Sequence, residues 1–239
     1  MPLDIKSNHI IFNKMKESNL YTIIYASVMV TLVAVLLAFT SESLRGLQKK
    51  NEANDKRRQI LRSVNVSVAG AETEKKYNEL IKEAFVVNEK GQKVSGDAFA
   101  VDAAKMFADN TYPVFVALIG GKTKYIMAMF GAGLWGPVWG YLSVDDDGVT
   151  VFGTDFSHQG ETPGLGAEIA TPAFSSLFSG KQLFKNNIFK SIAIVKNGKS
   201  IKGQDFVDGI SGGTITSAGV DRMMKQSLER YVEFLKSIN

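Results

Sequence analysis

The sequence predicts an α+β protein with a single N-terminal transmembrane helix, followed by a domain built on a mostly antiparallel sheet with flanking helices. Residues 20–40 form a long uncharged apolar run, which predicts the transmembrane helix. Short β-rich runs separated by turn residues fill the middle of the chain, and an amphipathic helical pattern closes it. Because helices frame the strands rather than alternate with them, an antiparallel sheet is favoured over a parallel one.

The apolar run reads LYTIIYASVMVTLVAVLLAFT, twenty-one residues without a charge. At ~1.5 Å per residue a helix of this length spans about 31 Å, which matches a hydrocarbon core of roughly 30 Å. Tyr21 and Tyr25 suit the aromatic belt at the membrane surface. A cleaved signal peptide is the alternative, but its apolar region is usually only about 7–15 residues long. A membrane anchor is therefore the favoured interpretation.

The charges on either side of the anchor leave its orientation open. Residues 1–19, expected to be a short cytoplasmic segment, carry fewer basic side chains than the residues that follow the anchor. The positive-inside rule would therefore keep the C-terminal side in the cytoplasm, although a large translocated domain can override that bias.

Beyond the anchor, the sequence predicts a helical stalk or linker at 41–69 and a folded domain at 70–239. The stalk is basic, so binding to anionic lipid is a second interpretation of it. The domain itself is close to neutral, whereas binding to a phosphate backbone needs a basic face on the folded domain. We therefore expect no nucleic-acid partner.

Within the domain, hydrophobic periodicity predicts mixed secondary structure. The expected helices cover 72–84 and 97–108. The expected strands cover 114–119, 124–130, 138–144, 149–156 and 191–196, with a hairpin turn at Asp146-Asp147-Gly148. A long closing helix is expected to bury Val220, Met223, Met224, Leu228, Tyr231, Phe234, Leu235 and Ile238.

The composition narrows the chemistry that this chain can perform. It contains no cysteine, which excludes disulfides, thiolate catalysis and cysteine-ligated clusters within the chain. It contains two histidines, so a site with several histidine ligands is not expected, and we predict no metal site. His158 and Glu161 are too weak a signal for acid–base catalysis, and the residues at 145–148 lack the further oxygen ligands of a calcium loop. If the chain moves electrons, an organic cofactor carries them.

Three glycine-bearing loops are the strongest candidates for a site: residues 131–137, 158–169 and 208–217. The third precedes the closing helix, where free amides and the helix dipole favour a phosphate. Thr216 or Ser217 can instead be the N-cap of that helix, so both interpretations stay open. The standard nucleotide-binding motifs are missing.

The third loop reads Asp208-Gly-Ile-Ser-Gly-Gly-Thr214, and it resembles the flavinylation motif of the sodium-translocating NADH:quinone reductases and their Rnf relatives. The resemblance implies that a flavin transferase links FMN to Thr214 through a phosphoester, and that the transferase reads Asp208 as part of the motif. One departure is Gly213, where the family usually has alanine.

The other two loops extend the resemblance. Glu161-Thr-Pro-Gly-Leu-Gly166 resembles a hallmark of the same flavin domain, and Gly133-Leu-Trp-Gly136 resembles the segment that supplies a tryptophan near the flavin ring. An indole packs well against a flat aromatic ring and excludes water from it. The cofactor-binding residues that the resemblance implies are Thr214, Trp135, Glu161, Thr162, Gly164, Leu165, Gly166, Ser211, Gly213, Ile215 and Thr216.

The resemblance implies an electron-transfer component of a sodium-pumping NADH:ubiquinone or menaquinone reductase, a translocase, with no catalytic residue of its own. The chain would relay electrons between an iron–sulfur centre and the covalent flavin of the B subunit. Its expected partners are membrane lipid, the B, D and E subunits, with A and F in the same complex, and the flavin transferase. It would be a single-pass protein of the bacterial inner membrane with a periplasmic domain.

Two alternatives remain at this point. The G subunit of an Rnf complex shares the flavin motif, but Gly-Leu-Trp is more typical of the C subunit of the reductase. The other is a membrane-anchored binding module without flavin.

Overall fold

The computed structural model describes residues 19–238, so nearly all of the predicted N-terminal segment 1–19 lies outside the described residues. Contacts divide the chain into two compact units, Met1–Ala53 and Asn54–Asn239, each described by itself. The second unit therefore begins before residue 70, where the folded domain was expected to start. The expected division of the chain at residue 70 stays a prediction.

The first unit consists, in its described part, of the beginning of helix α2 (Asn19–Ser63). Within residues 19–238, α2 is the one helix long and apolar enough to cross a membrane, with a mean hydropathy of 2.4 in its most apolar window. The large apolar side chains between Leu20 and Phe39 are exposed, as expected for a surface that faces lipid. The predicted long apolar N-terminal helix is confirmed.

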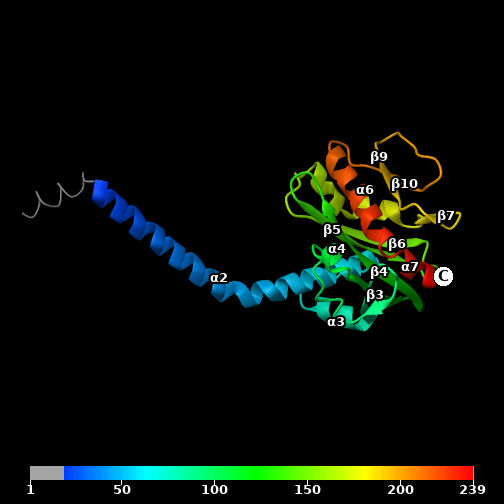
Figure 1. Cartoon of the computed structure of the whole chain (residues 1–239), viewed down its shortest axis with the longest axis horizontal. Coiled ribbons are helices and arrows are strands. Elements are labelled where there is room, and N and C mark those ends of the chain that lie inside the picture. The colour runs from blue at the N-terminus through cyan, green and yellow to red at the C-terminus, as the bar shows by residue number, and fades with distance from the viewer. Residues whose placement is uncertain (1–18, 239) are drawn as a thin grey trace, which may run out of the picture. The chain divides into compact units, whose positions relative to one another are not determined.

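The second unit is built on a six-stranded antiparallel sheet with the order β2-β1-β3-β4-β5-β6 (Figure 1). The strands are β1 (Ile81–Val87), β2 (Lys93–Val94), β3 (Tyr112–Ile119), β4 (Lys122–Ala132), β5 (Pro137–Val144) and β6 (Val151–His158). The turn between β5 and β6 holds Asp147, whose carboxylate accepts hydrogen bonds from the amides of Val149 and Thr150. Both the antiparallel sheet and this hairpin are confirmed.

Shorter elements come before, between and after the strands of this sheet, and one longer helix packs on it. The helical ones are α3 (Glu72–Leu80), α4 (Met106–Asp109), η1 (Gly166–Ala170), α5 (Pro172–Ser175), η2 (Ser176–Phe178), α6 (Thr214–Glu229) and α7 (Val232–Ser237). The short strands are β7 (Phe184–Lys185), β8 (Ile188–Phe189), β9 (Ala193–Val195) and β10 (Phe206–Asp208). The last two form a parallel pair, and α6 packs against both β4 and β9.

The core lies between the sheet and α6. Val220, Met223, Met224 and Leu228 on α6 are buried against sheet residues, as the periodicity predicted. The closing helix is interrupted, however, because a turn at Arg230 and Tyr231 separates α6 from α7. The buried Tyr231 hydroxyl donates to the carbonyls of Pro113 and Ala128, two acceptors on neighbouring strands.

The C-terminal end of α2, residues 54–63, belongs to the second unit, and we call it the docked helix end. Ile60 and Leu61 are fully buried there. Arg62 donates two hydrogen bonds to Asp155 of β6, at 2.7 and 3.0 Å. The Trp139 indole donates to the Gln59 side chain at 3.0 Å. Residues that the sequence analysis assigned to a stalk are thus part of the packing of the folded unit.

Two of the expected helices are wrong in extent. The helix expected at 72–84 ends at Leu80, because residues from Ile81 onward pair with β3. The helix expected at 97–108 is replaced by turns, with helix only from Met106. Asp97 and Asp102 accept hydrogen bonds from amides two residues ahead, which competes with the helical pattern.

Candidate functional site

The three glycine-bearing loops come together around the side chain of Glu161. Residues 131–137 connect β4 to β5, residues 158–169 lead from β6 into η1, and residues 208–217 lead from β10 into α6. Glu161 Oε1 accepts hydrogen bonds from the amides of Leu134 and Trp135, at 2.8 and 2.9 Å. Glu161 Oε2 accepts the hydroxyl of Thr216. One carboxylate therefore joins all three loops.

Glu161 is 4% exposed, and two glycines make room for its carboxylate. A Cβ at Gly166 would lie 2.6 Å from Glu161 Oε2, and a Cβ at Gly133 would overlap Glu161 Oε1. Burial acts to raise the pKa of Glu161, but the hydrogen bonds from Thr216, Trp135 and Leu134 outweigh burial and hold that pKa below its usual value. The side chain is therefore an ionised group in a site built to fit it.

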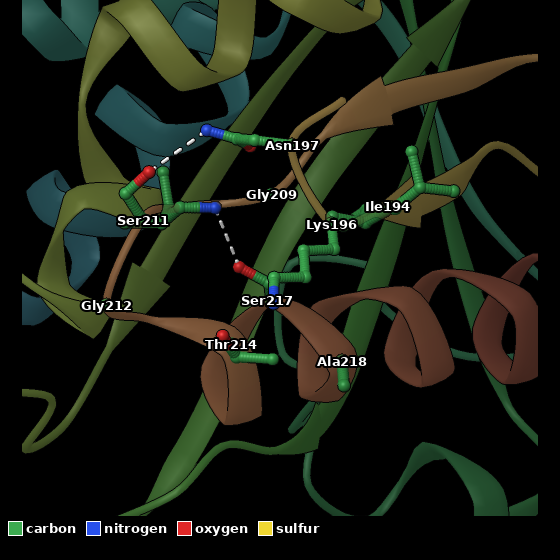
Figure 2. A pocket seen from close by; sticks show the side chains of 11 residues that line it. Ile194, Lys196, Asn197, Gly209, Ser211, Gly212, Thr214, Ser217 and Ala218 are labelled. Atoms are coloured by element: carbon green, nitrogen blue, oxygen red, sulfur yellow. Dashed lines mark hydrogen bonds between the residues drawn. The ribbon is translucent and has the colours of Figure 1, made fainter. Parts of the chain in front are cut away.

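Thr214 is the first residue of α6 and lines a pocket of about 250 Å³ between β9 and the loop that follows β10 (Figure 2). Its side chain is exposed and makes no hydrogen bond to the part of the chain that the structure describes. The N-cap residue of α6 is Gly213, which provides no side-chain cap. The first amides of the helix therefore lack a capping side chain beside the Thr214 hydroxyl.

The neighbouring hydroxyls are already engaged. Ser211 Oγ accepts from the Asn197 side chain at 3.0 Å, and Ser217 Oγ accepts from the amide of Ile210 at 2.9 Å, as Figure 2 shows. Thr216 is 1% exposed and donates to Glu161. Thr216 and Ser217 thus lie inside α6 with partners elsewhere, and the suggestion that one of them is the N-cap is wrong.

Exposed apolar side chains surround the loop cluster. Trp135 is 69% exposed, and Leu134, Leu165 and Ile215 are exposed as well. Leu165 lies against the backbone of Gly212, since a Cβ at that glycine would come within 2.6 Å of the leucine. Trp135 is therefore not a core residue, and these side chains present an apolar surface beside Thr214.

The remaining predicted residues occupy the edges of the cluster. Thr162 is exposed, and its carbonyl accepts the amides of Leu165 and Ala167. Gly164 has a φ of 74°, a conformation that glycine adopts without strain, and its amide donates to Glu168. Asp208 is exposed at the end of β10.

Two features of the site escaped sequence reasoning. The motif named Glu161 as a residue near the cofactor, but no local pattern indicated that its carboxylate would bond to both other loops. Lys196 and Asn197 line the pocket beside Thr214, and they reach it only because β9 pairs with β10. Within residues 19–238 no group of three or more His, Cys, Asp or Glu side chains could hold a metal ion.

Comparisons of this chain with known protein families, sequences and solved structures agree with one another. Residues 133–229 match the family described as FMN-binding domain. The C subunit of the Na(+)-translocating NADH-quinone reductase of Vibrio anguillarum is 32% identical over 208 residues, which cover 78% of this chain and 81% of the relative. The C subunit of the same reductase from Haemophilus ducreyi is 30% identical over 236 residues and 90% of both chains.

Two solved structures share the fold. The crystal structure of the Na(+)-translocating NADH-quinone reductase C subunit from Parabacteroides distasonis is 65% identical, with a TM-score of 0.80, and the match covers 82% of this chain and 98% of that one. Shewanella oneidensis NqrC is 26% identical, with a TM-score of 0.67 and coverage of 79% and 98%.

Proposed function

The chain belongs to the family of Na(+)-translocating NADH-quinone reductase C subunits, and we propose that it carries FMN covalently through a phosphoester on Thr214. Membership makes it an electron-transfer component of the reductase, with an FMN-binding domain. The main support for a covalent bond is the Thr214 hydroxyl at the start of α6. This hydroxyl is exposed and makes no hydrogen bond within the described residues.

One part of the site fits the phosphate end of FMN, and another part fits its flavin ring. The pocket beside Thr214 measures about 250 Å³, below the roughly 300–1,000 Å³ of sites that enclose a whole ligand. The uncapped start of α6 suits the phosphate end. The exposed Trp135, Leu165 and Ile215 offer an apolar surface against which the flavin ring can pack.

Formation of the phosphoester requires an activated donor, a flavin phosphoanhydride presented by the transferase. Thr214 Oγ1 forms the new P–O bond to the flavin phosphate while the anhydride P–O bond breaks and releases a nucleoside monophosphate. The hydroxyl proton passes to a base on the transferase. The exposed positions of Thr214 and Asp208 suit such an approach, whereas the buried Thr216 does not.

FMN supplies one-electron transfer when it is bound, and the side chains of this chain tether it, pack against it and shield it from water. We propose that the electrons pass between an iron–sulfur centre and the flavin of the B subunit, with the D, E, A and F subunits as further partners. We also propose that the domain is periplasmic. The anchor helix and family membership support a membrane location.

The two alternatives from the sequence are less well supported. The relatives and solved structures described above are C subunits of the reductase, which favours the reductase over an Rnf complex. The match of residues 133–229 to an FMN-binding family argues against a binding module without flavin.

The attachment is tested by Thr214→Val, which removes the hydroxyl at nearly constant volume. We expect complete loss of the FMN mass from the peptide that contains residue 214, with the fold retained because the side chain is exposed. Thr214→Ser is the matched control and should retain the modification. FMN found on a peptide modified at Thr216 would disprove the assignment. Asp208→Ala should lower the modified fraction if the transferase reads this side chain.

The orientation is tested by adding protease to intact spheroplasts and to inverted vesicles. A periplasmic domain predicts digestion of the folded domain in spheroplasts, while the anchor stays in the membrane. Digestion in inverted vesicles alone would show that the domain is cytoplasmic, as the charge bias around the anchor suggests.

A further inference from the structure

Three of the roughly four acceptor positions of the Glu161 carboxylate are already used within the protein. Oε1 accepts two amides, those of Leu134 and Trp135, and Oε2 accepts the Thr216 hydroxyl. The side chain is 4% exposed and is enclosed by the backbones of Gly133 and Gly166. Because the side chain is buried and already bonded on both oxygens, little room is left for a direct contact between this carboxylate and a cofactor.

The three bonds connect the two parts of the proposed flavin site. Thr216 lies two residues after Thr214 in the first turn of α6, so the bond to Oε2 fixes the turn that holds the attachment residue. The bonds to Oε1 fix the backbone of Trp135, whose indole is exposed. A single side chain therefore links the turn that holds the proposed attachment residue to the backbone that carries the indole.

We propose that Glu161 is a positioning residue of the flavin site, which holds Thr214 and Trp135 at a fixed separation without contacting the cofactor. This inference rests on the proposed function, because it concerns the same site. It assigns Glu161 and Thr216 a role other than the direct contact that the sequence motif suggested. The lowered pKa of Glu161 agrees with it, since an ionised carboxylate accepts all three hydrogen bonds.

The proposal predicts that weakening either set of bonds changes the surroundings of the flavin ring. Glu161→Gln keeps the size of the side chain but replaces one acceptor oxygen by a donor, which no longer accepts the Thr216 hydroxyl. Thr216→Val removes that hydroxyl at nearly constant volume and leaves the carboxylate charged. Both variants retain Thr214, so the cofactor should remain attached.

The experiment uses the full chain, purified with its cofactor, and a matched control on the same helix. Ser227 is buried near the C-terminal end of α6, where it accepts the amide of Phe130 and donates to its carbonyl, and it bonds to neither Glu161 nor Thr216. Ser227→Ala therefore destabilises the packing of α6 without touching the site. Each protein is measured for FMN mass on the Thr214 peptide, melting temperature, visible circular dichroism of the flavin and flavin fluorescence anisotropy.

We expect Glu161→Gln and Thr216→Val to keep the FMN mass but to lose most of the visible dichroism and to lower the anisotropy, because the ring is less well held. Thr216→Ser should restore the wild-type signals, and Ser227→Ala should lower the melting temperature alone. If Glu161→Gln does not fold, Thr216→Val decides the question.

Unchanged flavin signals in both site variants would overturn the proposal and leave Glu161 a purely structural residue. A change in Glu161→Gln but not in Thr216→Val would also overturn it, because it would indicate a direct contact with the flavin. Absence of FMN from the wild-type Thr214 peptide would instead remove the proposed function, and this inference with it.

Discussion

The docked helix end and the loop cluster each depend on one buried carboxylate, and the two carboxylates are stabilised in different ways. Asp155 is 6% exposed and faces Arg62 in a two-bond ion pair that ties α2 to β6. Glu161 accepts only neutral donors, two amides and a hydroxyl, which tie three loops together. The two residues follow one another closely in the chain, at and just after β6.

Their pKa values shift in opposite directions. Burial raises the pKa of Asp155, and the bonds from Arg62 offset only part of that effect. For Glu161, the three donors outweigh burial and lower the pKa. The Arg62 side chain is 43% exposed, so water screens its charge, whereas the donors to Glu161 are held in place by the backbone and by α6. The donors to Glu161, with a smaller contribution from nearby His158, thus outweigh the effect of burial there, whereas Arg62 offsets only part of the effect of burial at Asp155.

Among the substitutions that this comparison suggests, replacing Arg62 by methionine should cause the largest loss of stability. It leaves the carboxylate of Asp155 buried without a charged partner, which should lower the free energy of unfolding by about 2 kcal/mol at neutral pH. Loss of a partner from a fully buried pair costs roughly 3–5 kcal/mol, and the exposure of Arg62 reduces the figure. Urea unfolding of the wild type, Arg62→Met and Arg62→Lys measures it. A loss below about 0.5 kcal/mol, the range of an ordinary surface substitution, would show that the pair is not needed.

Acid should affect the two carboxylates in opposite ways. Glu161 contributes stability that is present above its unfolded pKa of about 4.3 and is lost as the pH falls through its lower folded pKa. The raised pKa of Asp155 means that ionisation costs stability, and this cost disappears as the pH falls towards about 3.9. Each effect is on the order of 1 kcal/mol for a shift of one pKa unit.

Urea unfolding between pH 6 and pH 3 tests these signs. Glu161→Gln should lose less stability in acid than the wild type, and Asp155→Asn should lose more. Parallel curves for the wild type and both variants would contradict the opposite shifts. Arg62→Lys keeps a cation beside Asp155 and should follow the wild type.

The smallest stability effect is expected at Trp135. Trp135→Ala should change the free energy of unfolding by no more than about 0.5 kcal/mol, because the indole is 69% exposed. Trp139→Ala is the matched comparison at the docked helix end, and it should cost more because Trp139 is half-buried and donates to Gln59. Melting curves of the two variants test this, and equal losses would mean that Trp135 packs in the core.

The sequence predicted those parts of the fold in which local pattern and tertiary packing agree. The strands alternate and are bounded by turn residues, and Val220, Met223 and Leu228 repeat at helical spacing on a face that is buried. The apolar anchor was evident from its length alone.

Prediction was wrong where distant residues decide the local structure. Residues 97–108 are rich in alanine, but the local bonds of the two aspartates described above compete with a helix. In addition, the carbonyls of Phe99 and Val101 accept hydrogen bonds from Lys56, which lies on α2. Lys82, Glu83 and Ala84 favour a helix by themselves, yet β3 lies beside them and pairs with this part of the chain. Neither partner is visible within a short window of sequence.

The candidate site shows the same limit. The motifs indicated three loops and the proposed attachment residue, and resemblance supplied their expected chemistry. Neither motif spacing nor composition could show that Thr216 is buried and that Thr214 is exposed, because this depends on how α6 packs against Glu161.

The bonds of Glu161 also determine when the site can form during folding. The carboxylate bonds to Thr216 across 55 residues of sequence and to Leu134 across 27. Contacts of such long range form only after the intervening chain has been ordered, here β5, β6 and the segment that leads into α6. The loop cluster can therefore form only after these segments are ordered, and an enzyme that modifies Thr214 in this geometry would act on a chain in which they have already folded.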